Sequence, residues 1–399
     1  MAFATLVLGA GVLAAEEGAL PLTLEQALAE ARAHNPTLAA ARLQAAVDGA
    51  GVAVAREWPN PEARYERTNE LPREALSVAQ VLELPGKRAR RVAVAQAAVG
   101  SGAAEIERAQ RDVEGDVRRA FYAVADAQRR SVLVLELRQI AARARATAAA
   151  RFDAGDVPRL DVLQADLALL QAENEAGAQE GRTRAAVATL NVLVGREAQA
   201  ATEVADADEV AALPDAESAL ADAMAHNAGL LVLERQAAQA KARASLARAE
   251  RWPDPTVEGA LTHDAEPEFN WGWRASVGLS LPLFTTHGAQ VRLEEAAALA
   301  LRAQRDALER RIRADVAAAL YRAGAQRQVY LRYRDEILPR SRDVEAMAQE
   351  SYKSGQTALP ALLQALQAAR EVLTQALQAQ SDYDAALADL AQATTAGTK

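Results

Sequence analysis

Hydrophobic and polar residues alternate strictly over residues 271–281. Every odd position there is apolar or aromatic, and every even position is Gly, Ser or Arg. A period of two predicts a β-strand with one apolar face, and about eleven residues is the length that a tilted strand needs to cross a bilayer. Two Trp residues at one end of this face stand where the aromatic girdle of a membrane barrel would lie. The predicted membrane-facing residues of the strand are Trp271, Trp273, Val277, Leu279 and Leu281.

A weaker copy of the same pattern precedes it in the first half of the chain. Leu76, Val78, Leu82 and Leu84 are apolar at alternate positions, and Ser77 and Glu83 lie between them. We add Val78 and Leu82 to the predicted membrane-facing set. The runs 62–68 and 256–263 each supply a partner strand, which predicts β-hairpins at about 62–84 and 256–282. A small soluble sheet covered by helices is the alternative interpretation.

Long helical stretches follow each predicted hairpin. Residues 87–153 contain no Pro, and at 1.5 Å per residue such a helix is about 100 Å long. A returning helix is predicted at 160–193, and the second half repeats this at 288–354, with Pro339, and 360–390. The spacing of Ile106, Val113, Val117, Phe121 and Val124 predicts a packed seam on the first helix, which Leu160, Leu163, Leu167 and Leu170 continue on the returning helix. A soluble coiled coil would show the same seams.

The chain is an internal duplication. His34-Asn35 recurs as His226-Asn227 at an offset of about 192 residues, and Trp58-Pro59 recurs as Trp252-Pro253. Leu84-Pro85 matches Leu281-Pro282, Phe121-Tyr122 matches Leu320-Tyr321, and Gly155 matches Gly355 at an offset of about 200. The offset drifts slowly and in one direction, so the matches are collinear, as expected of a repeat of half the chain.

The duplication sets the predicted domain organisation. We divide the chain into a signal peptide at 1–15, a first repeat at 20–196, a linker at 197–213, a second repeat at 214–391 and a tail at 392–399. Each repeat contains two helices, broken at Asn35-Pro36 in the first, then a β-hairpin and a long helical hairpin, at 87–193 and 288–390. Thr23 is the predicted cap of the first helix.

Composition narrows the class of protein. The net charge of -9 argues against a nucleic-acid partner, and the absence of Cys excludes disulfides and thiolate metal sites. The apolar start at 1–15 has the length of a signal-peptide core, with Val12-Leu13-Ala14 as a cleavage site. No other apolar run reaches the length of a membrane-spanning helix, so a membrane span would have to be made of strands.

Four strands cannot close a barrel, and unpaired strand edges are not tolerated in lipid. The barrel must therefore be shared between chains. Two chains would supply eight strands, whose interior is filled by side chains, whereas three would supply twelve and leave room for a conduit. A channel function thus predicts a homotrimer.

This arrangement resembles the TolC family of outer-membrane efflux proteins over nearly the whole chain after residue 20. The opening Leu22-Thr23-Leu24-Glu25-Gln26-Ala27-Leu28, the Asn35-Pro36 break and the turns at Gly155 and Gly355 carry the resemblance. The segments Ser77-Val-Ala-Gln80 and Glu83-Leu84-Pro85-Gly86-Lys87-Arg88 resemble the cation-efflux branch of the family, the cobalt–zinc–cadmium type.

The resemblance implies a fold that is mainly α with a transmembrane β part. A homotrimer would form a 12-stranded β-barrel in the outer-membrane lipid, continued by an α-helical barrel in the periplasm. It also implies two protein partners, a periplasmic adaptor that docks on the helix tips and an inner-membrane pump of the resistance–nodulation–division (RND) class. The tip residues here are Arg151, Phe152, Gly155, Asp156, Leu160, Asp161, Tyr352, Lys353, Gly355 and Leu359.

The family often closes its tunnel with Asp residues six and nine positions after the second-tip Gly. Ala361 and Gln364 occupy those positions here, and Asp161 and Gln164 occupy them in the first repeat. These four are the candidate aperture residues. An Asp beside a helix start is commonly a cap, so Asp161 has that alternative role.

No enzyme, cofactor or metal site is predicted. The spacing of His34, His226, His263 and His287 provides no chelating pair, and no nucleophile elbow or phosphate loop occurs. The function predicted is a passive outer-membrane conduit of a tripartite RND system that exports divalent heavy-metal cations. A multidrug or type I secretion channel is the first alternative, and a soluble coiled-coil scaffold or adaptor is the second.

Overall fold

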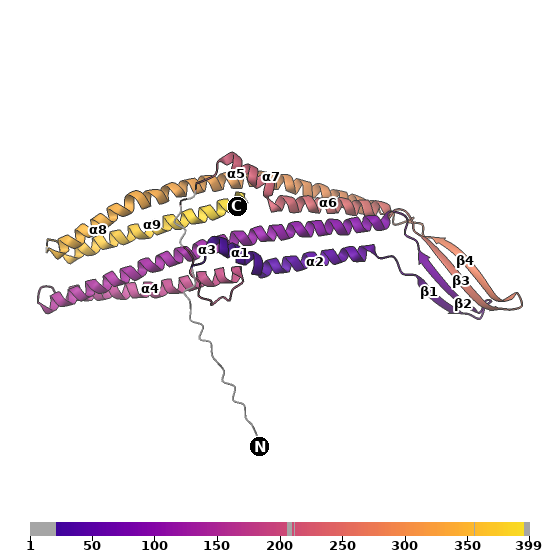
Figure 1. Ribbon diagram of the computed structural model, residues 1–399, viewed down its shortest axis with the longest axis horizontal. Coiled ribbons are helices and arrows are strands. Elements are labelled where there is room, and N and C mark those ends of the chain that lie inside the picture. Colours follow the sequence, from indigo (N-terminus) through magenta and orange to yellow (C-terminus); the bar gives the residue numbers. More distant parts are fainter. Residues whose placement is uncertain (1–20, 206–209, 211, 355, 395–399) are drawn as a thin grey trace, which may run out of the picture. The chain divides into compact units, whose positions relative to one another are not determined.

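The computed structural model describes residues 21–205, 210, 212–354 and 356–394, which are mainly helical with one four-stranded sheet (Figure 1). The chain divides into two compact units, which are considered separately below. The first comprises Met1–Ala29 and Ala120–Val210, and the second comprises Glu30–Arg119 and Ala211–Lys399. The predicted signal peptide at 1–15 lies outside the described residues, and the division into repeats stays a prediction.

Each repeat begins with two helices separated by an Asn. Helix α1 spans Leu24–His34 and α2 spans Pro36–Arg56, and in the second repeat α5 spans Ala216–His226 and α6 spans Ala228–Ala249. Thr23 caps α1, because its hydroxyl accepts a hydrogen bond from the Gln26 N–H while the Gln26 side chain accepts one from the Thr23 N–H. Asn35 caps α2 and Asn227 caps α6. The predicted cap and helix break are confirmed.

The four strands form one antiparallel sheet in the order β1-β2-β3-β4. Its members are β1 (Glu62–Arg67), β2 (Glu74–Val81), β3 (Pro255–Ala265) and β4 (Phe269–Leu279). Pairing of β2 with β3 joins the hairpins of the two repeats. Within the described part of the chain, the outer edges of β1 and β4 pair with no strand.

Two helical hairpins follow the strand hairpins. Helix α3 spans Lys87–Asp153, the range predicted from its lack of Pro, and α4 spans Arg159–Val194. The predicted seam on α3 is buried at Val113, Val117, Phe121 and Val124, whereas Ile106 is half-buried. The α3 seam is therefore a core face, as its heptad-like spacing indicated.

The second hairpin is interrupted by a wider turn. Helix α7 (Gly288–Arg332) passes into a π-helical turn, η1 (Tyr333–Ile337), and then into α8 (Leu338–Lys353), and α9 (Leu359–Thr394) returns. Pro339 lacks an N–H and its ring clashes with the preceding turn, which favours the local widening that precedes it. The sequence predicted a helix across this region but not the π-helical turn.

Alanine dominates the core of the second unit. Ala219 and Ala223 of α5 pack with Leu230 of α6 and with Ile312 and Val316 of α7. A second cluster joins α7 and α9 through Ala319, Ala323, Ala386 and Leu390. Small side chains let the helices approach closely.

One described segment, Leu24–Arg56, is long and apolar enough to cross a membrane by length and composition alone. This differs from the expectation that strands alone could do so. The segment is α1 and α2 together, and Asn35 interrupts it by accepting hydrogen bonds from the Thr37 and Leu38 N–H groups. Core helices of soluble proteins and signal sequences have the same length and composition.

The start of the predicted linker is held against the first unit. Leu22 forms a parallel bridge with Val204, and the buried Asn191 side chain donates to the Ala200 carbonyl and accepts from the Thr202 hydroxyl. Ala200 and Thr202 are thus held by α4, and Val204 is held by the segment before α1.

Candidate functional site

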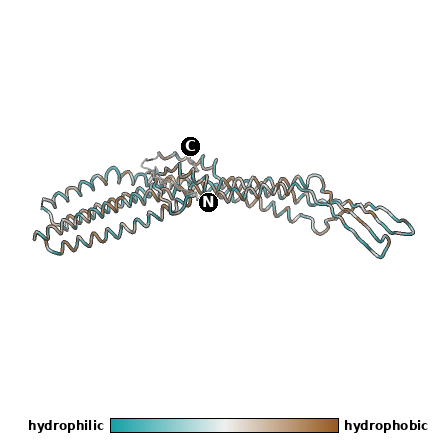
Figure 2. The backbone as a smooth tube through the Cα atoms, turned by 60° about the horizontal axis from the view of Figure 1, so that its bottom comes forward, coloured by the Kyte–Doolittle hydropathy of each residue, from teal (hydrophilic) through white to brown (hydrophobic). Residues whose placement is uncertain are grey.

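One face of the sheet is largely apolar and exposed, and its row at the far end contains Arg67, Glu74, His263 and Trp271. The register places Tyr65, Leu76, Leu261 and Trp273 in a single row across all four strands. All four are exposed, and Trp273 is 79% exposed. Hydrophilic and hydrophobic stretches both occur along the strands (Figure 2). A row of large apolar side chains facing outward requires an apolar environment to cover it.

Every predicted membrane-facing residue is exposed. On the strands these are Trp271, Trp273, Val277, Leu279 and Val78, and Val277 is 74% exposed. Leu281 and Leu82 are also exposed but lie just beyond the ends of β4 and β2. The strand predicted over 271–281 therefore ends two residues early, because Pro282 cannot continue a ladder.

The opposite face of the sheet is polar. Arg64, Ser77, Ala260 and Arg274 form one row across it. The next row contains Glu62, Ala79, Glu258 and Ser276, in which the Ser276 hydroxyl donates to Glu258. An apolar face backed by a polar face is the arrangement of a membrane barrel wall that lines a polar lumen.

Trp residues flank the apolar face at both ends. Trp58 and Trp252 precede β1 and β3 at the helix end of the sheet, and both are exposed. At the other end Trp271 lies opposite His263, with ring centroids 4.4 Å apart. Eleven residues of β3 tilted by about 45° rise roughly 25 Å, the height of the apolar band of an outer-membrane barrel.

The junction between sheet and helices is held by ion pairs. The Lys87 ammonium lies 2.8 Å from the Asp254 carboxylate and donates to the Trp252 carbonyl, and the Leu84 N–H donates to Asp254. Arg91 pairs with Glu83 and also donates to the carbonyl groups that end α2. The segment 83–88 that suggested the cation-efflux branch thus contributes to this junction.

The first predicted tip is a tight helix-to-helix turn in the first unit. Gly155 has φ of 80° and follows α3, while the Asp156 N–H donates to the Arg151 carbonyl and the Gly155 N–H donates to the Phe152 carbonyl. This pair of bonds is the Schellman motif, which requires a left-handed residue. Phe152 and Leu160 are exposed on either side of the turn.

The second predicted tip repeats one of these bonds in the second unit. The Gln356 N–H donates to the Ser351 carbonyl at 2.9 Å, the equivalent of the Asp156 bond, and Tyr352 is half-buried. Gly355 lies outside the described residues, as do the side chains of Lys353 and Leu359. Both tips stay predictions as docking sites.

The candidate aperture residues lie near the starts of two helices. Asp161 is half-buried and Gln164 is exposed on α4, whereas Ala361 and Gln364 are both exposed on α9. The N-cap of α4 is Pro158, with no side-chain cap bond, so Asp161 lies within the first turn and does not cap the helix. A negative charge at this position stabilises the helix through its interaction with the helix dipole.

The leucine seam on α4 differs from the expectation of a packed face. Leu160, Leu163, Leu167 and Leu170 are all exposed in the single chain. Their spacing of three and four residues places them on one stripe of the helix. Sequence periodicity identified the stripe but could not say which molecule covers it.

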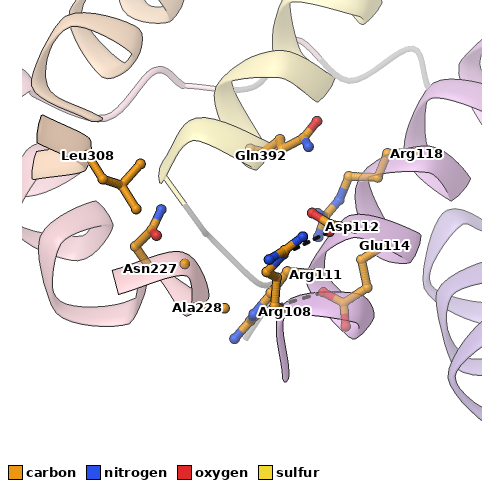
Figure 3. A pocket seen from close by; sticks show the side chains of 11 residues that line it. Arg108, Arg111, Asp112, Glu114, Arg118, Asn227, Ala228, Leu308 and Gln392 are labelled. Carbon is orange, nitrogen blue, oxygen red and sulfur yellow. Dashed lines mark hydrogen bonds and ion pairs between the residues drawn. The ribbon is translucent and has the colours of Figure 1, made fainter. Parts of the chain in front are cut away.

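A charged cavity of about 230 Å³ lies in the second unit between α3, α6, α7 and α9 (Figure 3). Arg108 lies 3.7 Å from Asp112, and Arg111 lies 3.4 Å from Glu114, which also accepts a hydrogen bond from Arg32. Burial raises the pKa of Glu114, but hydrogen bonds from Arg32 and Gln110 and the nearby guanidinium charges lower it to below its usual value. The cavity is a salt-bridged part of the scaffold.

The His residues have separate surroundings. His226 lies near the Asp222 carbonyl, His263 near Glu74 and His287 near Glu250. In the part of the chain that the structure describes, no group of three or more His, Asp or Glu side chains is placed to hold a metal ion.

Comparison with known sequences decides the family. The family described as "Outer membrane efflux protein" matches residues 27–196 and 219–396. This chain belongs to that family. The efflux protein is therefore an outer-membrane protein whose helical part extends into the periplasm, as the resemblance and the localisation inferred from the sequence indicated. Its family and the matched structures are channels rather than enzymes.

Individual relatives support the same assignment. The efflux protein is 29% identical over 301 residues to the cobalt-zinc-cadmium resistance protein CzcC of Cupriavidus metallidurans, covering 74% of this chain and 71% of the relative. A membrane protein from Pseudomonas aeruginosa has a similar fold, with a TM-score of 0.77, 20% identity and 93% of both chains covered. The Campylobacter jejuni CmeC outer membrane channel has a TM-score of 0.77, 13% identity, and coverage of 93% of this chain and 85% of that one.

Proposed function

We propose that the efflux protein is the outer-membrane conduit of a tripartite RND system, and that it exports divalent heavy-metal cations. The observation that carries the conduit is the sheet, whose exposed apolar face is backed by a polar face. The cation substrate is supported by the relative named as a cobalt-zinc-cadmium resistance protein. The chain belongs to a family of outer-membrane efflux proteins, which argues against the alternative of a soluble scaffold.

The conduit requires three copies of the chain. The outer edges of β1 and β4 have unsatisfied backbone groups among the described residues, and such edges must be paired in lipid. Three four-stranded sheets would close a 12-stranded barrel wide enough for passage, whereas two would give a barrel filled by its own side chains. The homotrimer closes through pairing of β4 with β1 of the next copy.

The duplication supplies the register of that pairing. Val78 of β2 lies opposite Gly259 of β3 within one chain. The hairpins correspond through their pairs, Tyr65 with Leu76 and Gly259 with Ala275, so Tyr65 is the equivalent of Gly259 and Val78 of Val277. The same register therefore puts Val277 opposite Tyr65 of the neighbouring copy. Both residues are exposed and belong to the apolar face.

Oxidative cross-linking tests this register directly, because the chain contains no Cys. The double variant Val277→Cys and Tyr65→Cys should form covalent dimers and trimers in outer membranes, since directly opposed residues have Cβ atoms about 5 Å apart. The matched control pairs Val277→Cys with Arg64→Cys, which lies on the opposite face. Cross-linking of the control alone would contradict the proposed closure.

The helix tips are proposed to dock the periplasmic adaptor. Phe152 and Leu160 are exposed beside the Gly155 turn, and the α4 leucine stripe continues from the same tip. Exposed apolar stripes at helical spacing suit partner helices. The Asp156 and Asp161 carboxylates near this tip would attract cations electrostatically, whereas the equivalent positions of the second hairpin are Gln356 and Ala361, which carry no charge.

Deletion of the gene tests the proposal that the exported substrates are divalent heavy-metal cations. We expect cells lacking the efflux protein to become more sensitive to divalent heavy-metal cations than to dyes or detergents. The reverse pattern would assign the protein to multidrug export, and loss of a secreted polypeptide would assign it to type I secretion. Reconstituted protein should conduct ions in planar bilayers, and a failure to do so would contradict the conduit itself.

A further inference from the structure

The connection from β4 to α7 is an exposed apolar segment. Leu281, Leu283 and Phe284 are all exposed, and Phe284 is 100% exposed. In the first repeat Gly86 alone separates Pro85 from α3, whereas residues 283–287 separate Pro282 from α7. The helix thus begins farther from the Pro in the second repeat and leaves these apolar side chains exposed, so we sought what could cover them.

The segment continues the apolar face of the sheet. The apolar positions of β4 continue in the sequence at Leu281 and Leu283, where the Leu283 N–H donates to the Leu281 carbonyl and the chain turns. Pro255 lies opposite Leu279, which brings the segment to the level of the exposed Trp252. Trp58 precedes β1 at the same end of the sheet. Exposed aromatic and aliphatic side chains at one level of a membrane barrel lie where the acyl chains meet the headgroups.

Arginines surround the same level of the molecule. We call the following five residues the arginine collar: Arg56, Arg88, Arg90, Arg251 and Arg292. Arg88 stacks over the Trp58 ring at 4.8 Å. None of the five forms an ion pair with a described carboxylate, whereas Lys87 and Arg91 take up Asp254 and Glu83.

Two members of the collar converge. An Nη atom of Arg251 lies 3.7 Å, and one of Arg292 3.8 Å, from the position that a Cβ atom at Gly288 would occupy. The two Nη atoms are therefore no more than about 7.5 Å apart, and their like charges favour an anion beside them. Two carboxylates of this region have other partners, because Glu250 lies 3.6 Å from His287 and Glu295 pairs with Arg248. The region is therefore locally positive in a chain of net charge -9.

We propose that the apolar segment and the arginine collar together bind phospholipid in the periplasm-facing leaflet of the outer membrane. Leu283 and Phe284 lie among the acyl chains, and Arg251 and Arg292 bind the headgroup phosphates. Guanidinium groups bind phosphate through paired hydrogen bonds, and apolar residues beside basic ones are typical of interfacial segments. The inference rests on the proposed function, because it requires that the apolar sheet face meets lipid.

Spin labels at single cysteines test the apolar half of the proposal. In liposomes that contain phosphatidylglycerol, a nitroxide on Phe284→Cys should be relaxed more by oxygen than by a water-soluble nickel chelate. A label on Val277→Cys reports whether the strands lie in lipid, and one on Tyr321→Cys, at an exposed position of α7, reports solvent.

The three labels distinguish failure of the lipid-binding proposal from failure of the proposed conduit function. A lipid-exposed label at Val277 with a solvent-exposed label at Phe284 would overturn the inference and leave the proposed conduit intact. A label at Phe284 that neither reagent reaches would place the segment against a second copy of the chain and would also overturn it. A solvent-exposed label at Val277 would contradict the proposed function.

Arginine variants test the charged half. Phosphatidylglycerol should raise the melting temperature of the purified wild-type protein in detergent, and the double variant Arg251→Gln and Arg292→Gln should lose at least half of that rise. The matched control is Arg305→Gln with Arg311→Gln on α7, whose side chains pair with Glu309 and Asp315. An equal rise in both double variants, or the same rise with inorganic phosphate in place of lipid, would overturn the assignment.

Discussion

Lys87, the first residue of the long helix α3, lies 2.8 Å from Asp254, which precedes a strand of the other repeat. The pair therefore ties the first repeat to the second where the sheet meets the helices. Both side chains are largely buried, and Asp254 also accepts the Leu84 N–H. This contact helps to fix how β2 enters its pairing with β3.

We expect Lys87→Met to destabilise the protein by about 1–3 kcal/mol, because it leaves a partly buried carboxylate without its cation. The control is Arg184→Gln, which removes an exposed pair with Glu180 and should cost less than about 0.5 kcal/mol. Thermal unfolding of the purified protein measures both. Equal effects of the two changes would show that the Lys87 pair has no special role.

Glu114→Gln should lower stability at neutral pH by about 1–3 kcal/mol, because Arg32 loses a charged hydrogen-bond acceptor. The pKa of Glu114 is lowered in the folded protein. Its contribution is thus complete above the pKa of the unfolded chain, about 4.3, and is lost as the pH falls through the lower folded value.

Unfolding of the wild type and of Glu114→Gln from pH 7 down to pH 3 measures this contribution. The difference between the two proteins should shrink in acid. Asp112→Asn is the control, because the Asp112 pair with Arg108 is exposed. A difference that stays constant with pH would contradict the role of the Glu114 carboxylate.

Gly155→Ala should destabilise the first helical hairpin by about 1–2 kcal/mol, because φ of 80° is unfavourable for a residue with a Cβ atom. Gly177→Ala lies inside α4, where a Cβ atom meets nothing within 4 Å, and should stabilise the helix by about 1 kcal/mol. Chemical denaturation of the full-length variants measures both. Effects of the same sign would contradict the tip geometry.

Val277→Arg should reduce assembly in the outer membrane, because an Arg on the lipid face of a barrel costs about 2–4 kcal/mol near the midplane. Ser276→Arg is one residue away on the polar face and should assemble normally. The amount of heat-dissociable oligomer in the membrane fraction distinguishes them. Normal assembly of both variants would argue against a lipid-facing role for Val277.

Local patterns in the sequence were sufficient for the elements and for the face of each strand. The alternation at 271–281 identified the exposed side of β4, Asn35 and Pro36 identified the helix break, and the lack of Pro identified α3. The strand face, the helix break and the long helix are each determined by residues close together in the chain, so each can be predicted from a local sequence pattern.

Contacts between residues far apart in the chain could not be predicted from the sequence. Lys87 and Asp254 belong to different repeats, and no local rule connects their charges. The α4 leucines show a stripe, but periodicity does not distinguish a face covered within the chain from one covered by another molecule. The convergence of Arg251 and Arg292 depends on how the connection before α7 folds.

The π-helical turn at Tyr333–Ile337 also explains a detail of the duplication. The offset between the repeats is about 199 residues at Tyr122 and Tyr321 and about 200 at Gly155 and Gly355. A π-helical turn accommodates one additional residue without rotating the helix beyond it. Between these two landmarks the second repeat is one residue longer than the first, and the wide turn is where the helix can hold that residue without turning its remaining residues to another face.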